Sequence, residues 1–142
     1  MNYIKIEYCR KEDIKKCVDI ARTPELMLPD KTYPDDIYFR KVLDSDSIFL
    51  VAKNGKKILG FLIAHNIIGV SSFLDTLAVS KESRGKGIGR MLVSEYERHI
   101  KKEKIHYIFL FAMVTNESTL KFYEKNGFKS SEHDYKMFSR NI

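Results

Sequence analysis

The chain has 142 residues, of which 44% are hydrophobic and 31% charged, and a net charge of +6. These values are typical of one globular domain over residues 1–142 and exclude a disordered chain. No apolar run approaches the roughly 20 residues that a membrane-spanning helix needs, so we expect no membrane association. The basic balance favours an anionic partner, such as nucleic acid, an acidic protein or a phosphorylated cofactor.

The N-terminal residues and the cysteines indicate a reducing compartment. Residues 1–10 alternate apolar and charged side chains and lack the pattern of a secretory signal, so we expect a cytoplasmic protein. Cys9 and Cys17 have no second cysteine pair beside them and are expected to be reduced, structural thiols. The histidines are scattered without metal-ligand spacing or an obvious nucleophile partner, so no metal site is predicted. They are His65, His99, His106 and His133.

The first third of the chain alternates between strand and helix patterns. Period-two alternation predicts a strand over residues 3–8, and apolar spacing of 3.6 predicts a helix over residues 11–22. Three prolines make residues 23–36 mostly loop, before a short helix over residues 36–43. Long ordered loops are often functional, so residues 23–36 are a candidate substrate-binding segment.

The middle of the chain predicts a β-hairpin and a further strand. Residues 47–52 and 58–65 are apolar runs, and Asn54-Gly55 between them is a strong hairpin signal. Residues 72–79 predict the next strand.

The C-terminal half predicts two helices and further strands. An amphipathic helix is expected from about residue 87 to residue 102. A buried strand over residues 106–114 and a helix over residues 117–125 follow, and Asn126-Gly127 ends that helix. Residues 128–140 fit a closing pair of strands.

The most informative local feature is a glycine-rich segment, Arg-Gly-Lys-Gly-Ile-Gly-Arg, between a predicted strand and a predicted helix. Free backbone N–H groups and the positive end of the helix dipole converge at such a junction. Glycines let the backbone approach phosphate oxygens, and basic side chains add charge-assisted contacts. We therefore expect a pyrophosphate to bind here. The expected binding residues are Arg84, Gly85, Lys86, Gly87, Ile88, Gly89 and Arg90.

Two common classes of phosphate site do not match this segment. The Walker pattern is absent, so an NTPase is not expected. The spacing also departs from the G-x-G-x-x-G dinucleotide pattern, and Phe109 and Leu110 stand where an acidic ribose ligand is expected. A simple turn with solvated basic residues stays open as the alternative.

Two motifs resemble the GNAT superfamily of N-acetyltransferases. Residues 77–79 followed by R-x-x-G-x-G at 84–89 resemble its acetyl-CoA motif. Residues 116–128 resemble its N-x-x-A-x-x-x-Y-x-x-x-G-F segment, with Thr119 where alanine is commoner. The motifs lie within residues 73–128, and the order of predicted elements agrees with the family over the rest of the chain.

The resemblance implies a fold and a cofactor site. It implies a mixed α/β (α+β) architecture with a mostly antiparallel central sheet of about six to seven strands, flanked by about four helices. Two central parallel strands, here near residues 73–79 and 106–114, would splay apart around the pantetheine arm of acetyl-CoA. Backbone groups of Leu77, Ala78 and Val79 would bind this arm, and the Val79 N–H would polarise the thioester carbonyl.

The resemblance also implies roles for two residues of the second motif. Tyr123 would contact the cofactor and give a proton to the departing CoA thiolate. A core aromatic is the alternative for Tyr123, which shares a helical face with Thr119 and Leu120. Asn116 would bind the cofactor arm, and a helix N-cap is the alternative or additional role.

A base would help, because the attacking amine must be neutral. Counting by two along the strand places Asp75 on the face of Leu77 and Val79, and so toward the cleft. Asp75 would act directly or through water, and burial would be needed to raise its pKa toward neutrality. A structural, hydrogen-bonded aspartate is the alternative. Family members often place their base at positions that Phe73 or Ser71 fills here.

The resemblance thus implies transfer of an acetyl group from acetyl-CoA to a primary amine by direct attack in a ternary complex. Residues 23–36, 66–71 and 129–134 are the loops expected to select the acceptor. Similarity to ribosomal-protein alanine N-acetyltransferases favours a protein N-terminus, with a small-molecule amine or a non-catalytic CoA-binding regulatory module as alternatives. The basic residues form no tract, so nucleic acid is not expected, and monomer and homodimer both stay open.

Overall fold

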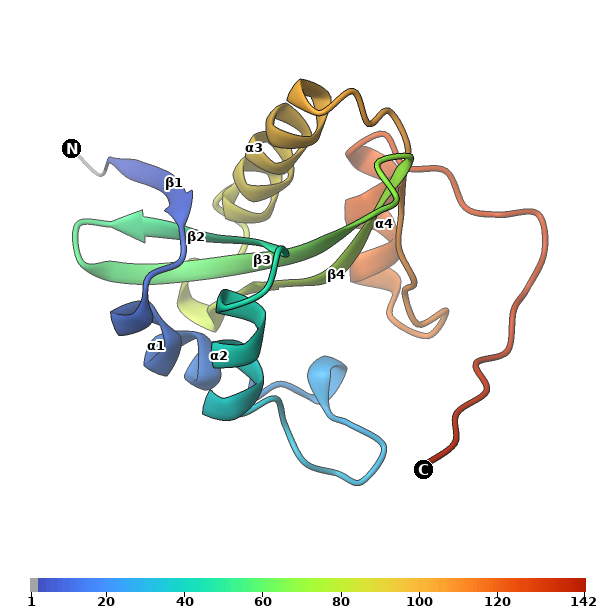
Figure 1. Ribbon diagram of the computed structural model, residues 1–142, viewed down its shortest axis with the longest axis horizontal. Helices are drawn as coiled ribbons and strands as arrows, with labels where there is room; N and C mark the ends of the chain where they lie inside the picture. Colours follow the sequence, from blue (N-terminus) through green and yellow to red (C-terminus); the bar gives the residue numbers. More distant parts are fainter. Residues whose placement is uncertain (1–2) are drawn as a thin grey trace. The chain divides into compact units, whose positions relative to one another are not determined.

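The computed structural model describes residues 3–142 as two compact units, one reaching to Leu110 and the other comprising Phe111–Ile142. The organisation of residues 1–142 as a single domain stays a prediction. Among the described residues, no helix is both long and apolar enough to cross a bilayer. The first unit contains β1 (Ile4–Tyr8), α1 (Ile14–Ile20), α2 (Asp36–Leu43), β2 (Ile48–Asn54), β3 (Lys57–Ile67), β4 (Ser71–Val79), α3 (Ile88–Lys102) and β5 (Ile108–Phe109), and the second contains α4 (Glu117–Lys125) (Figure 1).

The first unit is built on one mixed sheet with the strand order β1-β2-β3-β4-β5. The pairs β1–β2, β2–β3 and β3–β4 are antiparallel, and the pair β4–β5 is parallel. The predicted hairpin between β2 and β3 is present, and Gly55 in its turn has a φ of 63°. Glycine adopts this left-handed conformation at no steric cost, which explains why it stands in the turn.

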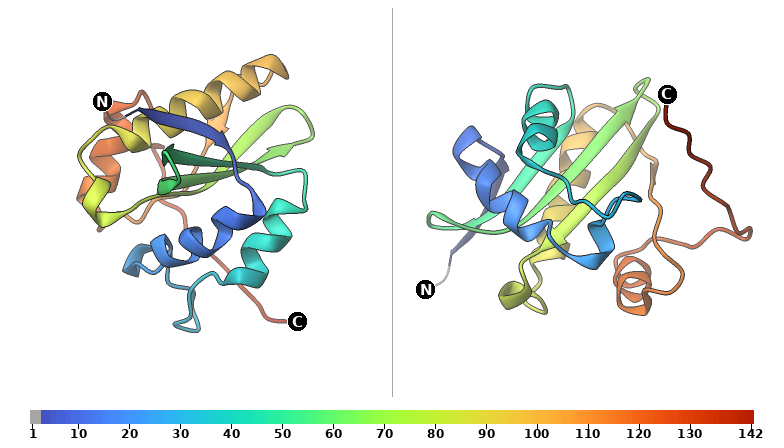
Figure 2. Two further views of the ribbon diagram at one scale, coloured as in Figure 1. Left: turned by 90° about the vertical axis from the view of Figure 1, so that its left-hand side faces the viewer. Right: turned by 90° about the horizontal axis from the view of Figure 1, so that it is seen from below.

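Helices cover both faces of this sheet. Figures 1 and 2 show α3 on one face, and α1 with α2 on the other. On the α1 and α2 side, the rings of Phe39 and Phe61 meet edge to face with centroids 5.3 Å apart. On the α3 side, the Tyr96 hydroxyl donates to Ser72 Oγ at 2.6 Å, and both residues are fully buried. Covered on both faces, β2 and β3 carry the nearly continuous apolar runs seen in the sequence.

The predicted fold class is confirmed, with fewer strands than expected. The described residues form five strands instead of about six to seven. The strand predicted over residues 106–114 is reduced to Ile108–Phe109, and residues 128–140 form no strand. A strand needs a partner edge and a buried face, and Met137 and Phe138 in the tail are largely exposed.

One helix also differs from its prediction. The pattern over residues 11–22 is divided between a 3₁₀ turn, Lys11–Asp13, and α1. Asp13 accepts from the Arg10 N–H at 2.9 Å, which stabilises the turn at the start of the helix.

Candidate functional site

The two parallel strands separate at a defined point. β4 pairs with β5 only at Ser72 and Phe73. On its other edge, β4 stays paired with β3 as far as Val79, which lies opposite Gly60. Among the residues described, the ladder between the parallel strands therefore ends before the second half of β4, which is the splay that the family resemblance predicts.

The second half of β4 directs backbone donors away from β3. The Ser80 N–H donates to the Leu59 carbonyl at 2.8 Å. Hydrogen-bonded pairs alternate along an antiparallel ladder, so Ala78 faces β3, and the N–H groups of Leu77 and Val79 face the opposite edge. The Val79 carbonyl lies on that same edge, where it accepts from Arg84 Nε at 3.2 Å.

A glycine in β3 lets the end of β4 lie this close. A Cβ added at Gly60 would meet the Ala78 carbonyl oxygen at 2.7 Å and Val79 Cα at 3.3 Å. No other residue fits without moving the backbone that carries the predicted cofactor contacts. We did not predict Gly60 as part of the site, although a glycine inside a strand pattern is a signal of close backbone approach.

The glycine-rich loop joins β4 to an uncapped helix. Gly85 and Gly87 have φ values of 76° and 82°, and a Cβ at either position would meet open space. Gly87 is the N-cap of α3 and provides no side-chain cap. The first N–H groups of the helix, beginning at Ile88, have no acceptor within the helix. They form a set of donors at the positive end of a 15-residue helix.

The residues around the loop fit a diphosphate. Ser80 Oγ is buried and has no hydrogen-bond partner among residues 3–142, so it can serve an incoming oxygen. Lys86 and Arg90 are exposed and able to reach an anion, whereas the side chain of Ile88 is buried in the core and offers only its backbone. Arg84 is held by the Val79 carbonyl. Together, an unpartnered hydroxyl, open glycines and free helix donors suit phosphate oxygens, which only accept hydrogen bonds.

Asp75 occupies a β-bulge in the middle of β4. Pairing with β3 passes from Ile63–Thr76 directly to Ala64–Leu74, which leaves Asp75 without a partner residue. Ile63 belongs to the core cluster beneath α1 and α2.

The bulge reverses one expectation. Asp75 does not share a face with Leu77 and Val79, because the additional residue shifts the alternation of side chains by one. Asp75 instead contacts His65, which lies beside Phe73 on the α1 and α2 side.

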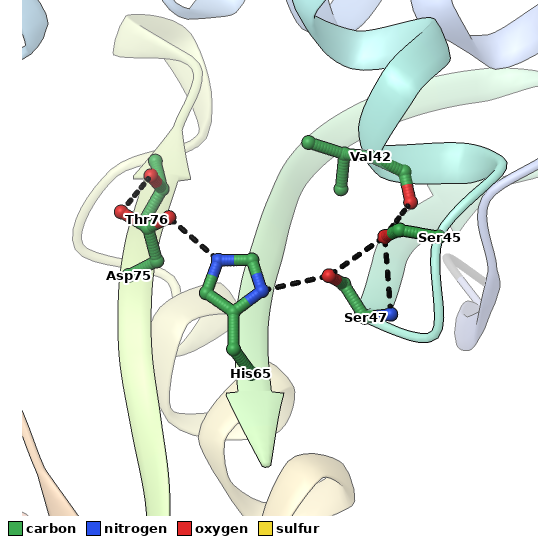
Figure 3. Close-up of polar contacts among 6 residues, drawn as sticks. All are labelled: Val42, Ser45, Ser47, His65, Asp75 and Thr76. Atoms are coloured by element: carbon green, nitrogen blue, oxygen red, sulfur yellow. Dashed lines mark hydrogen bonds and ion pairs between the residues drawn. The ribbon is translucent and has the colours of Figure 1, made fainter. Parts of the chain in front are cut away.

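The Asp75 carboxylate lies at one end of a chain of hydrogen bonds, and the residues in this chain come from three segments (Figure 3). Its Oδ2 lies 2.7 Å from His65 Nε2, and His65 Nδ1 lies 2.7 Å from Ser47 Oγ. The hydroxyls of Ser47 and Ser45 are 2.8 Å apart, and Ser45 donates to the Val42 carbonyl at 2.6 Å. The side chains of His65 and Asp75 are each about one-third exposed, at 35% and 32%.

Our sequence analysis missed His65 and Ser47. His65 is separated from its partners by 18 and 10 residues, and only strand pairing brings them together. The available signal was the predicted hairpin between residues 47–52 and 58–65, which places His65 beside the start of the strand at Ser47.

Tyr38 of α2 borders the same group. Burial raises the pKa of the Tyr38 phenol, and the negative charge of Asp75 raises it further, while the Thr76 side chain has a smaller opposing effect. The phenol is therefore neutral across the physiological range.

The second unit places Asn116 at the start of α4. Asn116 Oδ1 accepts from the Thr119 N–H at 3.3 Å and from the Ser118 hydroxyl at 3.1 Å. The helix-capping role that we considered for Asn116 is thus confirmed. Its contact with a cofactor stays a prediction.

The end of α4 explains the spacing of the second motif. The Phe128 N–H donates to the Tyr123 carbonyl at 3.0 Å, and the Gly127 N–H donates to the Glu124 carbonyl at 3.2 Å. Gly127 has a φ of 90°. These bonds form a Schellman motif, in which the residue after the glycine packs on the last turn of the helix.

Tyr123 is the residue on which Phe128 packs. The two ring centroids are 5.4 Å apart. Burial raises the pKa of Tyr123 to about 12. The phenol therefore keeps its proton at neutral pH, as a proton donor must. Tyr123 and Asn116 belong to the second unit and the other predicted site residues to the first, and their roles in catalysis stay predictions.

Metal ligands do not gather anywhere in the part of the chain that the structure describes. Residues 3–142 contain no group of three or more His, Cys, Asp or Glu side chains placed to hold a metal ion.

Comparison with known families confirms the resemblance carried by the two motifs. A model of the acetyltransferase (GNAT) family matches residues 8–128. An uncharacterized N-acetyltransferase of Methanocaldococcus jannaschii is 28% identical over 104 residues, which cover 67% of this chain and 45% of that protein. The match thus spans less than half the length of this relative.

Solved structures share the fold over nearly the whole chain. The PaiA N-acetyltransferase of Thermoplasma acidophilum, in complex with coenzyme A, has a TM-score of 0.80 at 24% identity, and the match covers 93% of each chain. A transcriptional regulator of Bacillus halodurans C-125 has a TM-score of 0.79 at 23% identity, covering 96% of this chain and 100% of that one. An aminoglycoside acetyltransferase from an uncultured soil metagenomic sample, in complex with sisomicin, has a TM-score of 0.77 at 20% identity, covering 99% and 97%.

Proposed function

The chain belongs to the acetyltransferase (GNAT) family, and on this premise we propose that it transfers the acetyl group of acetyl-CoA to a primary amine. One observation carries the proposal. The backbone donors of Leu77 and Val79 lie on the free edge of β4, immediately before a glycine loop and an uncapped helix. The donors on β4 suit a carbonyl oxygen, and those of the loop and helix suit a diphosphate.

Different residues of the chain bind different parts of acetyl-CoA. Acetyl-CoA supplies an acetyl group activated as a thioester. Backbone groups of Leu77 and Val79 bind the pantetheine arm, and Asn116 adds a side-chain contact. Contrary to the expectation from the sequence, the backbone groups of Ala78 face β3 and do not take part. The diphosphate is held by Arg84, Gly85, Lys86, Gly87, Ile88, Gly89 and Arg90.

Three groups act on the reacting atoms. Asp75 accepts the proton that the acceptor ammonium must lose, which frees the nitrogen lone pair for attack on the carbonyl carbon. The Val79 N–H donates to the carbonyl oxygen as negative charge develops there. Tyr123 gives its phenolic proton to the CoA sulfur as the carbon–sulfur bond breaks, and the second proton that the attacking nitrogen loses restores the phenol, so amide and free thiol are the products.

We propose a peptide N-terminus as the acceptor. The loop over residues 23–36 carries four acidic residues and one lysine, in a chain that is basic overall. Hydrogen bonds hold the pKa of Glu25 and of Asp30 below their usual range, chiefly from the Glu25 backbone and from the Thr32 hydroxyl respectively. Both are therefore anionic, and Met27 and Leu28 beside them are partly exposed. Negative charge next to apolar surface suits an α-ammonium group followed by side chains.

The test measures CoA thiol release with three kinds of amine. Peptides with different first residues, a polyamine and the aminoglycoside sisomicin would be compared, with acetyl-CoA binding followed by calorimetry. We expect turnover to be fastest with a peptide. Faster turnover of the polyamine or of sisomicin would contradict the proposed acceptor and leave acetyl transfer intact.

A second candidate is a CoA-binding regulatory module without catalysis. The fold shared with a protein described as a transcriptional regulator favours it. Tight acetyl-CoA binding without thiol release from any amine would support this candidate and contradict the enzyme.

The role of Tyr123 is tested by Tyr123→Phe. We expect kcat to fall by about 100-fold with acetyl-CoA affinity retained, because only the proton donor is lost. Gly87→Trp is expected to abolish binding instead, since Gly87 has a positive φ at the start of α3. Tyr135→Phe, an exposed tyrosine of the same unit, is the matched control. Unchanged turnover in Tyr123→Phe would show that the acid role is wrong.

A further inference from the structure

We propose that a row of rings beside Asp75 binds the first side chain of the acceptor and selects a peptide that begins with an aromatic residue. This ring row consists of His65, Phe73, Phe109 and Tyr107. The row would determine which peptide the site acetylates, so the inference rests on the proposed function and adds the class of acceptor that the site prefers.

Strand pairing brings the rings together from three strands. His65 of β3 lies opposite Phe73 of β4, and Phe73 lies opposite Phe109 of β5. Residues directly opposite each other on neighbouring strands point to the same face of a sheet. Tyr107 comes shortly before Phe109 in the chain, and the two ring centroids are 6.3 Å apart. The four rings therefore form one row across the sheet.

The rings of the row are close to parallel and lie at distances at which aromatic pairs attract each other. The centroids of His65 and Phe73 are 6.3 Å apart with the planes at 33°, and those of Phe73 and Phe109 are 5.2 Å apart with the planes at 25°. The planes of Tyr107 and Phe109 differ by 26°. Favourable aromatic pairs have centroids about 4.5–7 Å apart. An aromatic ring of a ligand can therefore join the row with the same geometry.

The row lies on the face of the sheet that is opposite to α3. Side chains alternate between the two faces along a strand. Ser72 contacts Tyr96 of α3 through its hydroxyl, so the next residue, Phe73, points to the face that carries α1 and α2. Asp75 also lies on this face, because its carboxylate contacts His65, the strand partner of Phe73. The rings and the carboxylate are therefore on the same side for a ligand.

The rings of the row keep exposed surface, unlike the core aromatic residues of the same face. Phe39 and Phe61 are only 1% and 0% exposed. Phe73 and Phe109 are half-buried, and Tyr107 is 63% exposed. Apolar surface that a ligand removes from water favours binding in proportion to its area. The row therefore offers an apolar ligand a contact that the core rings do not offer.

His65 connects the row to the carboxylate. Its Nε2 lies 2.7 Å from Asp75 Oδ2, and its Nδ1 lies 2.7 Å from Ser47 Oγ, so both ring nitrogens are engaged (Figure 3). These two contacts fix the orientation of the imidazole beside Phe73. A site that is already ordered loses little conformational freedom when a ligand binds.

The order of carboxylate and rings matches the order of groups in a peptide that begins with an aromatic residue. The Asp75 carboxylate attracts the α-ammonium group. Phe73 precedes Asp75 by two positions in β4, and two residues of a strand span roughly 6–7 Å. In an aromatic residue only Cα and Cβ separate the amino nitrogen from the ring. An ammonium group beside Asp75 therefore places such a ring next to Phe73, whereas the methyl group of alanine does not reach it.

The first test compares the turnover of peptides that differ only in their first residue. Phenylalanine, cyclohexylalanine and alanine would be placed first, and thiol release would give kcat/KM for each peptide. We expect the phenylalanine peptide to exceed the alanine peptide by about tenfold or more. The cyclohexylalanine peptide should lie between them, because a saturated ring covers apolar surface without aromatic pairing. Equal values for phenylalanine and alanine, or the highest value for cyclohexylalanine, would overturn the proposal.

Two substitutions test whether the row causes this preference. Phe73→Leu keeps an apolar side chain and removes the ring, so the preference for the phenylalanine peptide over the alanine peptide should fall by about fivefold or more. Turnover of the alanine peptide and acetyl-CoA affinity should stay close to those of the wild type, which also checks folding. Phe109→Leu, the second variant, should change the preference in the same direction. Tyr3→Leu, an exposed tyrosine outside the row, is the control. A preference that persists in both Phe73→Leu and Phe109→Leu would overturn the proposal.

A binding test needs no turnover. Phenylalaninamide would be titrated into the protein with CoA bound, while the NMR signals of the histidine rings are followed. We expect the signals of His65 to shift and those of His99, on α3 at the opposite face, to stay in place. Alaninamide should shift His65 less at the same concentration, and equal shifts with both amides would contradict the row. If phenylalaninamide binds as expected but no amine is acetylated, the proposed function has failed and the ring row stands.

Discussion

The two halves of β4 differ in how their backbone is paired. In the first half, Ser72 and Phe73 have strand partners on both sides, and Ser72 is fully buried. In the second half, Leu77 to Val79 pair with β3 alone and are partly exposed. The bulge at Asp75 lies between them. The first half of β4 is thus paired on both sides, whereas the second half has backbone donors on a free edge. We therefore expect substitutions in the first half to change stability and substitutions in the second half to change binding.

Asp75→Asn tests the boundary between the halves and has the largest expected effect. We expect kcat to fall by about 100-fold, because the amide cannot accept the proton of the amine. This loss corresponds to about 2.7 kcal/mol of activation free energy. Thiol release and acetyl-CoA calorimetry would measure it, and binding should be unchanged. Asp19→Asn on α1 is the control. Turnover close to that of the wild type would contradict the assignment of Asp75 as the base.

Gly60→Ala tests the second half. The added Cβ meets the Ala78 carbonyl oxygen at 2.7 Å, so β3 and β4 must separate. We expect a loss of about 1–3 kcal/mol in the free energy of unfolding, with weaker acetyl-CoA binding. Urea denaturation and calorimetry would show both effects. Gly55→Asn, in a turn with open space and a positive φ that asparagine tolerates, should change little. Normal cofactor affinity in Gly60→Ala would mean that the close approach is irrelevant to binding.

Tyr96→Phe tests the first half, where only stability should respond. The variant leaves the buried Ser72 hydroxyl without the hydrogen bond from Tyr96, which costs about 1–2 kcal/mol. Adding Ser72→Ala should recover part of the loss, since no unpaired hydroxyl then remains. Urea denaturation of the single and double variants would decide. Tyr8→Phe, which removes an exposed hydroxyl, is the control. A fall in acetyl-CoA affinity in Tyr96→Phe would contradict the expectation that the first half of β4 affects stability alone.

Alkaline pH should produce the smallest effect, again in the first half. Burial raises the pKa of Tyr96 to about 12, against about 10 in an unfolded chain. The unfolded chain loses this proton first, so the contribution is fully present below pH 10 and is lost between pH 10 and 12. We expect the free energy of unfolding to fall by about 1 kcal/mol more in the wild type than in Tyr96→Phe between pH 9 and pH 11. Equal losses in both proteins would contradict the assigned pKa.

Features encoded by neighbouring residues could be predicted from the sequence. The bounds expected for α2 and α4 agree with the structure, because periodicity and capping residues act within one or two turns. The glycine loop is also local: the positive φ of Gly87 and the start of α3 follow from a few consecutive residues. The same holds for Gly127, which ends α4.

Features that depend on distant pairing could not be predicted. The bulge at Asp75 is invisible in the sequence, because an additional residue in one strand is defined only against its partner. For the same reason His65 looked isolated, although three segments converge on it. The alternation near Tyr135 and Met137 resembles a strand, but a strand forms only where an edge is available to pair with it.

The bulge also has a consequence for how this protein can change over generations. A side chain at position 75 has no ladder partner, so its replacement need not disturb the register of β3 and β4. Substitutions there are therefore free to alter chemistry with little penalty in folding. The backbone of the bulge stays in place, and natural selection can change the side chain at position 75. Substitutions at position 75 can thus change the preferred acceptor or the pH range of activity while the fold stays the same.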